Sequence, residues 1–122
     1  MSSLLADLEK LFHEPTRLAI VSELSSVVGG LPFVELKKAC ELTDGNLSRH
    51  LAVLEKSGVV RVEKSFVGVK PRTTVTLTEQ GRKEFLKYLA TLERILETAS
   101  KRAQSAEAVA NKASARTKFK PA

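Results

Sequence analysis

Apolar residues recur at spacings of three and four in several stretches of the N-terminal half, and each stretch predicts an amphipathic helix. The first helix ends around His13, and Pro15 fits the first turn of the second, where its missing N–H costs nothing. A glycine pair ends the second helix, and a short third helix runs from about Pro32 or Phe33 to Cys40. The first helix is marked by Leu4, Leu8 and Leu11. The core face of the second helix is expected to be Leu18, Val21 and Leu24, or Ile20 and Leu24, and the third helix should turn Phe33, Leu36, and Ala39 or Cys40 inward.

A fourth helix is predicted between Thr43 and Gly58, and both of its ends are marked. Thr43 or Asp44 is expected to cap its N-terminus and Gly58 its C-terminus. The stripe expected to face the core is Leu47, Leu51 and Leu54. The opposite side carries Gly45, Arg49, Ala52 and Lys56, flanked by Asn46, Ser48 and His50. A donor-rich side with small residues at closest approach fits the major groove of DNA.

A basic β-hairpin is predicted directly after this helix. Val60 and Val62, and later Thr73, Val75 and Leu77, alternate as half-buried strands should. The connecting loop, residues 66–72, contains Gly68 and Pro71 and is the expected wing. The third and fourth helices, joined by a tight turn, form a helix-turn-helix. A helix-turn-helix followed by such a hairpin is the outline of a winged DNA-binding protein. Thr78 is expected to cap a final helix, with Glu79 in its first turn.

The C-terminal segment has the spacing of a coiled-coil seam. Large apolar residues and then alanines alternate at four and three along one side of a single helix. From Ala99 onward, a frayed Ala/Lys-rich tail is the alternative. The large residues need cover, and together with the first helix they predict a helical dimer interface. The residues assigned to that interface are Leu4, Leu8, Leu11, Phe85, Leu89, Leu92 and Leu96.

Composition limits the choice of class. A chain of 122 residues with 43% hydrophobic content supports one small domain, here residues 1–97, with an Ala/Lys-rich basic extension or tail at 98–122. No apolar run approaches the roughly 20 residues of a membrane span, and acids occupy the N-terminus, so we expect a cytoplasmic protein without a membrane partner. The single cysteine, Cys40, is interpreted as a small buried residue, with a redox or metal role as the alternative.

The net charge of +6 is unevenly distributed along the chain. Residues 1–97 carry 14 Lys and Arg against 13 Asp and Glu, whereas residues 98–122 carry 6 against 1. Within the nearly neutral first part, the hairpin gathers Arg61, Lys64, Lys70 and Arg72 against Glu63. Such a local patch supports nucleic-acid contact better than the overall charge does. The alternative is a solvated hairpin with ordinary surface lysines.

Three runs of sequence, LFHEPTRLAIVSEL, LSRHLAVLEKSGVVRVEK and TTVTLTEQGRKEF, resemble winged helix-turn-helix transcriptional regulators of the MarR/ArsR type. The resemblance covers roughly residues 8–97. It implies a mainly α fold with a small β-hairpin and a long C-terminal dimerisation helix. It also implies a homodimer that binds a pseudo-palindromic operator in double-stranded DNA and usually represses. By the same analogy Thr16 and Arg17 meet the DNA backbone, the fourth helix enters the major groove, and the wing reaches the flanking minor groove.

The candidate DNA-binding residues combine the helix, the wing and this analogy. They are Thr16, Arg17, Thr43, Asn46, Ser48, Arg49, His50, Lys56, Lys64, Lys70 and Arg72. His50 is expected to be a groove-side or phosphate-side contact rather than a metal ligand.

Departures from the family remove some functions and leave others open. Metal-sensing ArsR proteins place two cysteines in the region ELKKACEL, where this chain has Cys40 alone, so we expect no metal and no cofactor. No catalytic constellation occurs, which predicts a protein that is not an enzyme. A winged-helix module that binds protein, or an architectural DNA binder driven by the basic tail, are the alternatives. The sequence names no small-molecule effector.

Overall fold

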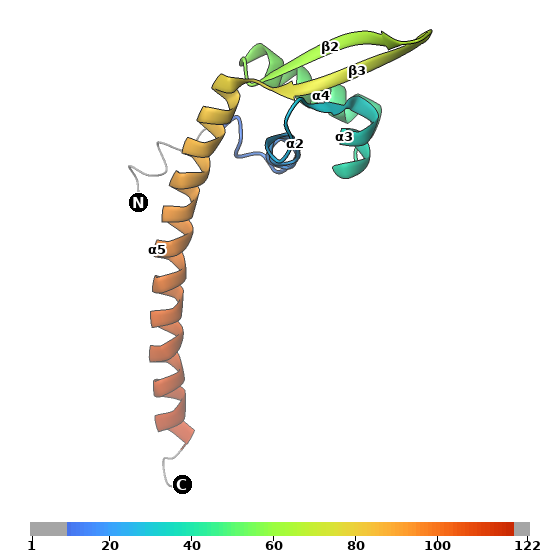
Figure 1. The fold of residues 1–122 in the computed structure, drawn as a ribbon. Helices are drawn as coiled ribbons and strands as arrows, with labels where there is room; N and C mark the ends of the chain where they lie inside the picture. The colour runs from blue at the N-terminus through green and yellow to red at the C-terminus, as the bar shows by residue number, and fades with distance from the viewer. Residues whose placement is uncertain (1–9, 119–122) are drawn as a thin grey trace.

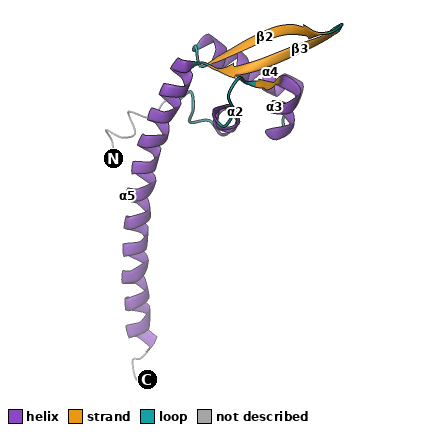
Figure 2. Ribbon diagram, in the orientation of Figure 1, coloured by secondary structure: helices purple, strands orange, loops and turns teal. Residues whose placement is uncertain are grey.

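The computed structural model describes residues 10–118, and its elements enclose a small core from which one long helix projects (Figures 1 and 2). The helix expected over Leu4 and Leu8 lies outside the described residues, except for a turn at residues 10–12. The elements, in chain order, are α2 (Pro15–Ser25), β1 (Leu31–Pro32), α3 (Phe33–Ala39), α4 (Asp44–Lys56), β2 (Val60–Val67), β3 (Lys70–Leu77) and α5 (Glu79–Lys118).

The core forms where α2, α3 and α4 meet the base of the hairpin. The predicted stripe Leu47, Leu51 and Leu54 is buried, and so are Ile20 and Leu24 of α2. Burying one such aliphatic side chain stabilises the fold by about 1.5–3 kcal/mol, so α4 is held mainly by this side. The remaining buried apolar residues are Phe12, Val21, Leu36, Val59, Val60, Val75, Leu77, Phe85 and Tyr88.

Both predicted ends of α4 are confirmed. The Thr43 hydroxyl accepts a hydrogen bond from the backbone N–H of Asn46 at 3.2 Å, which caps the N-terminus. At the other end Gly58 has φ +77°, a left-handed conformation that glycine adopts without strain. The N–H groups of Gly58 and Val59 then donate to the carbonyls of Glu55 and Leu54, both at 3.0 Å. The chain is thereby turned directly into β2.

The sheet has the strand order β1-β3-β2, and β1 was not predicted. This strand has two residues, too few for an alternating pattern, and it pairs Leu31 with Val75 of β3. The hairpin is also longer than predicted, because only Gly68 and Val69 separate β2 from β3. Pro71 lies within β3 opposite Phe66, not in a loop. It is tolerated there because β1 pairs only as far as Thr74, which leaves the outer edge of β3 free beyond that point.

The start of α5 is tied to the end of α4. The Thr78 hydroxyl accepts from the Gly81 N–H at 2.9 Å, as a cap should, and donates to the Gly58 carbonyl at 2.6 Å. The backbone N–H of Thr78 donates to the Val59 carbonyl at 2.9 Å. Gly81 lies so close to Val59 that an added Cβ would meet the carbonyl oxygen of that residue. Because Gly81 has no side chain, α5 can approach the Val59 backbone this closely.

Only the first turns of α5 belong to the core. Phe85 is 2% exposed and packs against Phe12 with ring centroids 5.4 Å apart, and Tyr88 joins them at 5.6 Å from Phe12. The assignment of Phe85 to a dimer interface is therefore wrong, because this ring is already covered within its own chain. α5 then continues as one helix through residues 99–118, in place of the frayed tail. No helix in the described part of the chain is long and apolar enough to cross a membrane.

Gly81→Ala should destabilise the protein although alanine usually favours helices by about 0.5–1 kcal/mol over glycine. The new methyl group would displace the Val59 backbone, and we expect a loss of about 1–3 kcal/mol in the free energy of unfolding. Urea denaturation measures it. Gly45→Ala, in the first turn of α4 with nothing within 4 Å of the new Cβ, is the control and should be neutral or stabilising. A Gly81→Ala protein as stable as wild type would contradict the close approach.

Candidate nucleic-acid interface

The outer side of α4 is exposed and carries polar side chains. Asn46, Ser48, Arg49 and Lys56 are exposed, as predicted, and so is Ala52 between them. The inner leucines hold the helix against the core, so these side chains all point outward from one rigid element. Thr43, at the N-terminus of α4, is exposed but its hydroxyl is used as the cap. The structure therefore brings most of the predicted helix residues onto one open surface.

The observed wing comprises residues 64–72, more than the predicted loop 66–72, because β2 and β3 continue into that loop. It presents its cations on both of its faces. Lys64 pairs with Thr73 across the hairpin, while Lys70 and Arg72 pair with Val67 and Ser65 on the other face. All three cations are exposed, and none of them forms an ion pair within the described part of the chain. Their charges are therefore available to an external anion.

A hollow of about 310 Å³ lies between α4 and the hairpin and is lined by residues of both. Ser48 and Ala52 of α4 line one wall, and Lys64 and Thr73 of the hairpin line the other. At its base the Glu55 carboxylate accepts a hydrogen bond from the Val62 N–H at 3.2 Å. This bond ties α4 to β2. The remaining lining residues are Phe33, Leu51, Glu55 and Val62.

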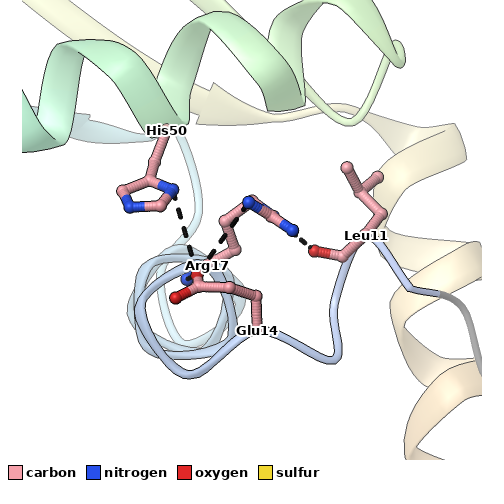
Figure 3. A network of polar contacts seen from close by, with 4 residues as sticks. All are labelled: Leu11, Glu14, Arg17 and His50. Atoms are coloured by element: carbon pink, nitrogen blue, oxygen red, sulfur yellow. Dashed lines mark hydrogen bonds and ion pairs between the residues drawn. The ribbon is translucent and has the colours of Figure 1, made fainter.

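His50 and Arg17 do not lie on this surface, and their assignment as DNA contacts is corrected by the structure. His50 is 9% exposed and faces α2, with Nδ1 3.8 Å from the Glu14 carboxylate (Figure 3). Arg17 donates from Nε to the Leu11 carbonyl at 2.7 Å and lies beside Glu14. Position 50 lies at the border of the leucine stripe, where helical periodicity alone does not decide whether a side chain is buried or exposed. Thr16, the remaining predicted residue of α2, is half-buried.

Glu14 is the functional position that the sequence interpretation missed. Its carboxylate accepts from the Arg17 backbone N–H at 2.7 Å and so caps α2, with His50 and Arg17 close by (Figure 3). Burial acts to raise the pKa of this carboxyl, but the N–H groups of Arg17 and Thr16 and the charges of His50 and Arg17 outweigh it. The pKa is lowered from its usual 4.5. An acid directly before Pro15 was the available signal.

The residues assigned to a dimer interface divide into three groups. Leu4 and Leu8 lie outside the described residues. Leu11, Leu89 and Leu92 are partly buried and pack against the domain's own core. Leu96 is 58% exposed and has no such cover. The exposed part of the α5 seam therefore starts near Leu96 and includes Ala99, Ala103, Ala106 and Ala110.

Cys40 follows α3 as its C-cap and is half-buried. Burial, and to a smaller extent the charge of Glu23, raise the pKa of its thiol above the usual value. The thiol therefore stays protonated at neutral pH, as an ordinary small core residue does. Among residues 10–118, no three His, Cys, Asp or Glu side chains converge as metal ligands would.

The chain is similar to known proteins over most of its length. Residues 16–96 match the family of the winged helix DNA-binding domain. An uncharacterized protein of Methanocaldococcus jannaschii is 36% identical over 83 residues, which are 66% of this chain and 86% of that protein. A transcriptional regulator homologue from Pyrococcus horikoshii is 31% identical, with TM-score 0.73, over 81% of this chain and 98% of that one.

More distant structures share the same fold. A MarR-family transcriptional regulator from Silicibacter pomeroyi is 25% identical, with TM-score 0.51, over 100% of this chain and 87% of that one. MepR of S. aureus, solved as a complex with DNA, is 18% identical with TM-score 0.65. That match covers 91% of this chain and 90% of MepR.

Glu14→Gln should lower the free energy of unfolding in a pH-dependent way, because the amide keeps an acceptor but loses the charge. A lowered pKa in the folded state means that the charge stabilises the fold above pH 4.5 and that this contribution disappears as the pH falls through the lowered pKa. We expect a loss of about 0.5–1 kcal/mol at pH 7, small because the site is partly exposed, and a smaller difference at pH 3.

Denaturant titrations of both proteins at the two pH values provide the measurement. Glu93→Gln, at an exposed position of α5, is the matched control and should change stability at neither pH. A Glu14→Gln deficit that is as large at pH 3 as at pH 7 would contradict the electrostatic role.

Proposed function

The chain belongs to the winged helix DNA-binding domain family as a transcriptional regulator of the MarR type, and on that premise we propose that it is a homodimeric, sequence-specific repressor. In this proposal α4 enters the major groove and the wing lies over the flanking minor groove. The observation that carries it is that exposed polar side chains of α4 and Lys64 of the wing border one hollow.

Base reading is assigned to the N-terminal half of α4. Arg49 can donate two hydrogen bonds to O6 and N7 of guanine, Asn46 can pair in the same way with adenine, and Ser48 can bond to either base. All three side chains are exposed on one side of the helix, beside the small Ala52. Small neighbours permit the close approach that such bonds need. Each bidentate pair contributes about 1–3 kcal/mol of discrimination against the wrong base.

Phosphate contact is assigned to the cations around this helix. Lys64 lies in the wall of the hollow, so a DNA strand that passes between α4 and the wing would meet it. Lys56 of α4 is exposed, and Lys70 and Arg72 are exposed on the opposite face of the hairpin from Lys64, where they can meet a second phosphate row. The N-terminus of α4, at Thr43, adds free backbone N–H groups, which favour phosphate oxygens. Arg17 and His50 are left out of this set because both are engaged within the chain.

Dimerisation is assigned to the uncovered part of α5. At 1.5 Å per residue this helix is roughly 60 Å long, and beyond Leu92 it projects away from the domain (Figure 1). Leu96 and the alanines that follow on the same side are the small and apolar residues that a second helix can pack against. A two-fold dimer would set two α4 helices about 34–36 Å apart, which matches a pseudo-palindromic operator. Such a dimer represses where its operator overlaps a promoter.

Arg49→Ala should reduce sequence preference more than it reduces general affinity. The target is a duplex selected by the wild-type protein from a random pool, and competition against a scrambled duplex gives the specificity ratio. We expect the ratio to fall by about 5- to 150-fold, because one bidentate base contact is lost. Arg72→Ala is the contrasting variant. It should weaken both duplexes alike and reduce the log–log salt slope by about 1.

An unchanged specificity ratio in Arg49→Ala would remove this side chain from base reading. A wild-type protein with no preference between the two duplexes, but a steep salt dependence, would instead support the architectural alternative. Absence of duplex binding would favour a module that binds protein.

Leu96→Glu combined with Ala103→Glu should convert a dimer into a monomer. Both side chains are exposed within the single chain and lie seven residues apart on the proposed seam, so the domain core is untouched. Two acids facing their counterparts would repel in the dimer. Sedimentation at micromolar concentration gives the mass, and we expect a large loss of affinity for the selected duplex in the variant.

Ser105→Glu combined with Ala108→Glu adds the same charge on the opposite side of α5 and should remain dimeric. A wild-type monomer, or a seam variant that still dimerises, would show that the interface lies elsewhere.

A further inference from the structure

The tip of the wing is apolar, which the proposed phosphate contacts do not explain. Phe66 is 74% exposed, Val67 57% and Val69 93%. They surround the two-residue turn at Gly68, whose positive φ of 64° permits a tight reversal of the chain. Single exposed apolar residues are common on protein surfaces. A group of three at a projecting tip is a local apolar patch.

These side chains have no role in the core of the domain. Strand alternation puts Phe66 on the same face of the hairpin as Val62, which is half-buried over the core. The ends of β2 and β3, however, extend beyond the helices, so no element lies beneath the tip (Figure 1). A serine or threonine at these positions would satisfy the strand as well. The apolar character therefore points to a partner outside the chain.

The charges around the patch define the partner. Residues 64–72 contain Lys64, Lys70 and Arg72 and no acid, and none of these cations pairs with an acid in residues 10–118. Such a tip is complemented by a polyanion that has a groove, in which the floor contacts the apolar side chains and the charged walls face the cations. Lys64 also lines the hollow against α4, on the same face of the hairpin as Phe66, so the tip continues the surface assigned to DNA. The floor of the minor groove, between two rows of phosphates, has these properties.

We propose that Phe66 and Val69 form an apolar wedge that enters the minor groove of the bound duplex and bends it. This inference rests on the proposed function. Val69 lies in the turn, and Phe66 lies near the end of β2 opposite Pro71, so only the end of the hairpin needs to approach the groove, which is about 6 Å wide. Apolar side chains in that groove contact sugars and base edges, partly open a base step and bend DNA away from the protein. The flanking cations hold the phosphates on either side.

The experiment uses the full-length protein and a duplex of about 30 base pairs, selected by the wild type from random sequence and labelled at its ends for energy transfer. Wild type should shorten the end-to-end distance. Phe66→Ser and Val69→Ser should each weaken binding about tenfold and reduce or abolish the bend. Their salt slopes should equal the wild-type slope, because no cation is removed. Val28→Ser, at a fully exposed valine away from the wing, is the control and should change nothing.

The outcomes distinguish the wedge from the proposed function. Wild-type binding without bending, or tip variants that bind and bend as wild type does, would overturn the wedge and leave DNA binding intact. Tip variants with unchanged DNA affinity but a smaller sedimenting mass would also overturn it, because the patch would then be a protein contact. Failure of the wild type to bind any duplex would overturn the proposed function together with the wedge.

Discussion

The burial of one side of α4 is the interaction on which the rest of the structure depends. Leu47, Leu51 and Leu54 hold this helix in the core, and its opposite side is thereby left open to solvent. The same packing sets the direction in which the chain leaves the helix, because Val59, the residue directly after Gly58, is buried as Leu54 is. The hairpin is then placed beside the helix, with the Glu55 to Val62 hydrogen bond at the junction. The buried leucine stripe of α4 therefore places both parts of the outer surface, α4 itself and the hairpin beside it.

The polar contacts on the inner side of α4 have a different purpose from those outside. Glu14 caps α2, and its carboxylate lies 3.8 Å from His50 Nδ1 of α4, so this acid faces both helices (Figure 3). Arg82 joins the end of α2 to α5, because its guanidinium donates to the Ser25 carbonyl at 3.0 Å. This hydrogen bond restricts the orientation of α5 against α2, which apolar packing alone does not do because packing is not directional. Charged residues such as Glu14 and Arg82 therefore have a structural role. They are less exposed than the candidate DNA contacts on α4 and the wing.

Much of this fold could be predicted from local signals. The leucine spacing of α4, the Thr43 cap, the turn at Gly58 and the Thr78 cap each depend on a few neighbouring residues, and the structure confirms all of them. The failures have tertiary causes. Phe85 has the spacing of a seam, but Phe12 and Tyr88 cover it. His50 and Arg17 are polar, but His50 faces Glu14 at the start of α2 and Arg17 donates to the Leu11 carbonyl, so neither is available to DNA. β1 and the position of Pro71 depend on strand pairing, which periodicity does not encode.

The central claim is that α4 and the wing act as one DNA-binding surface. The most direct test is amide hydrogen exchange of the protein, free and bound to a duplex selected from random sequence. The account predicts slower exchange in residues 44–49 and 66–71 on binding, and unchanged exchange in the exposed residues 28–29. Protection along α5 alone, with α4 and the wing unchanged, would contradict it.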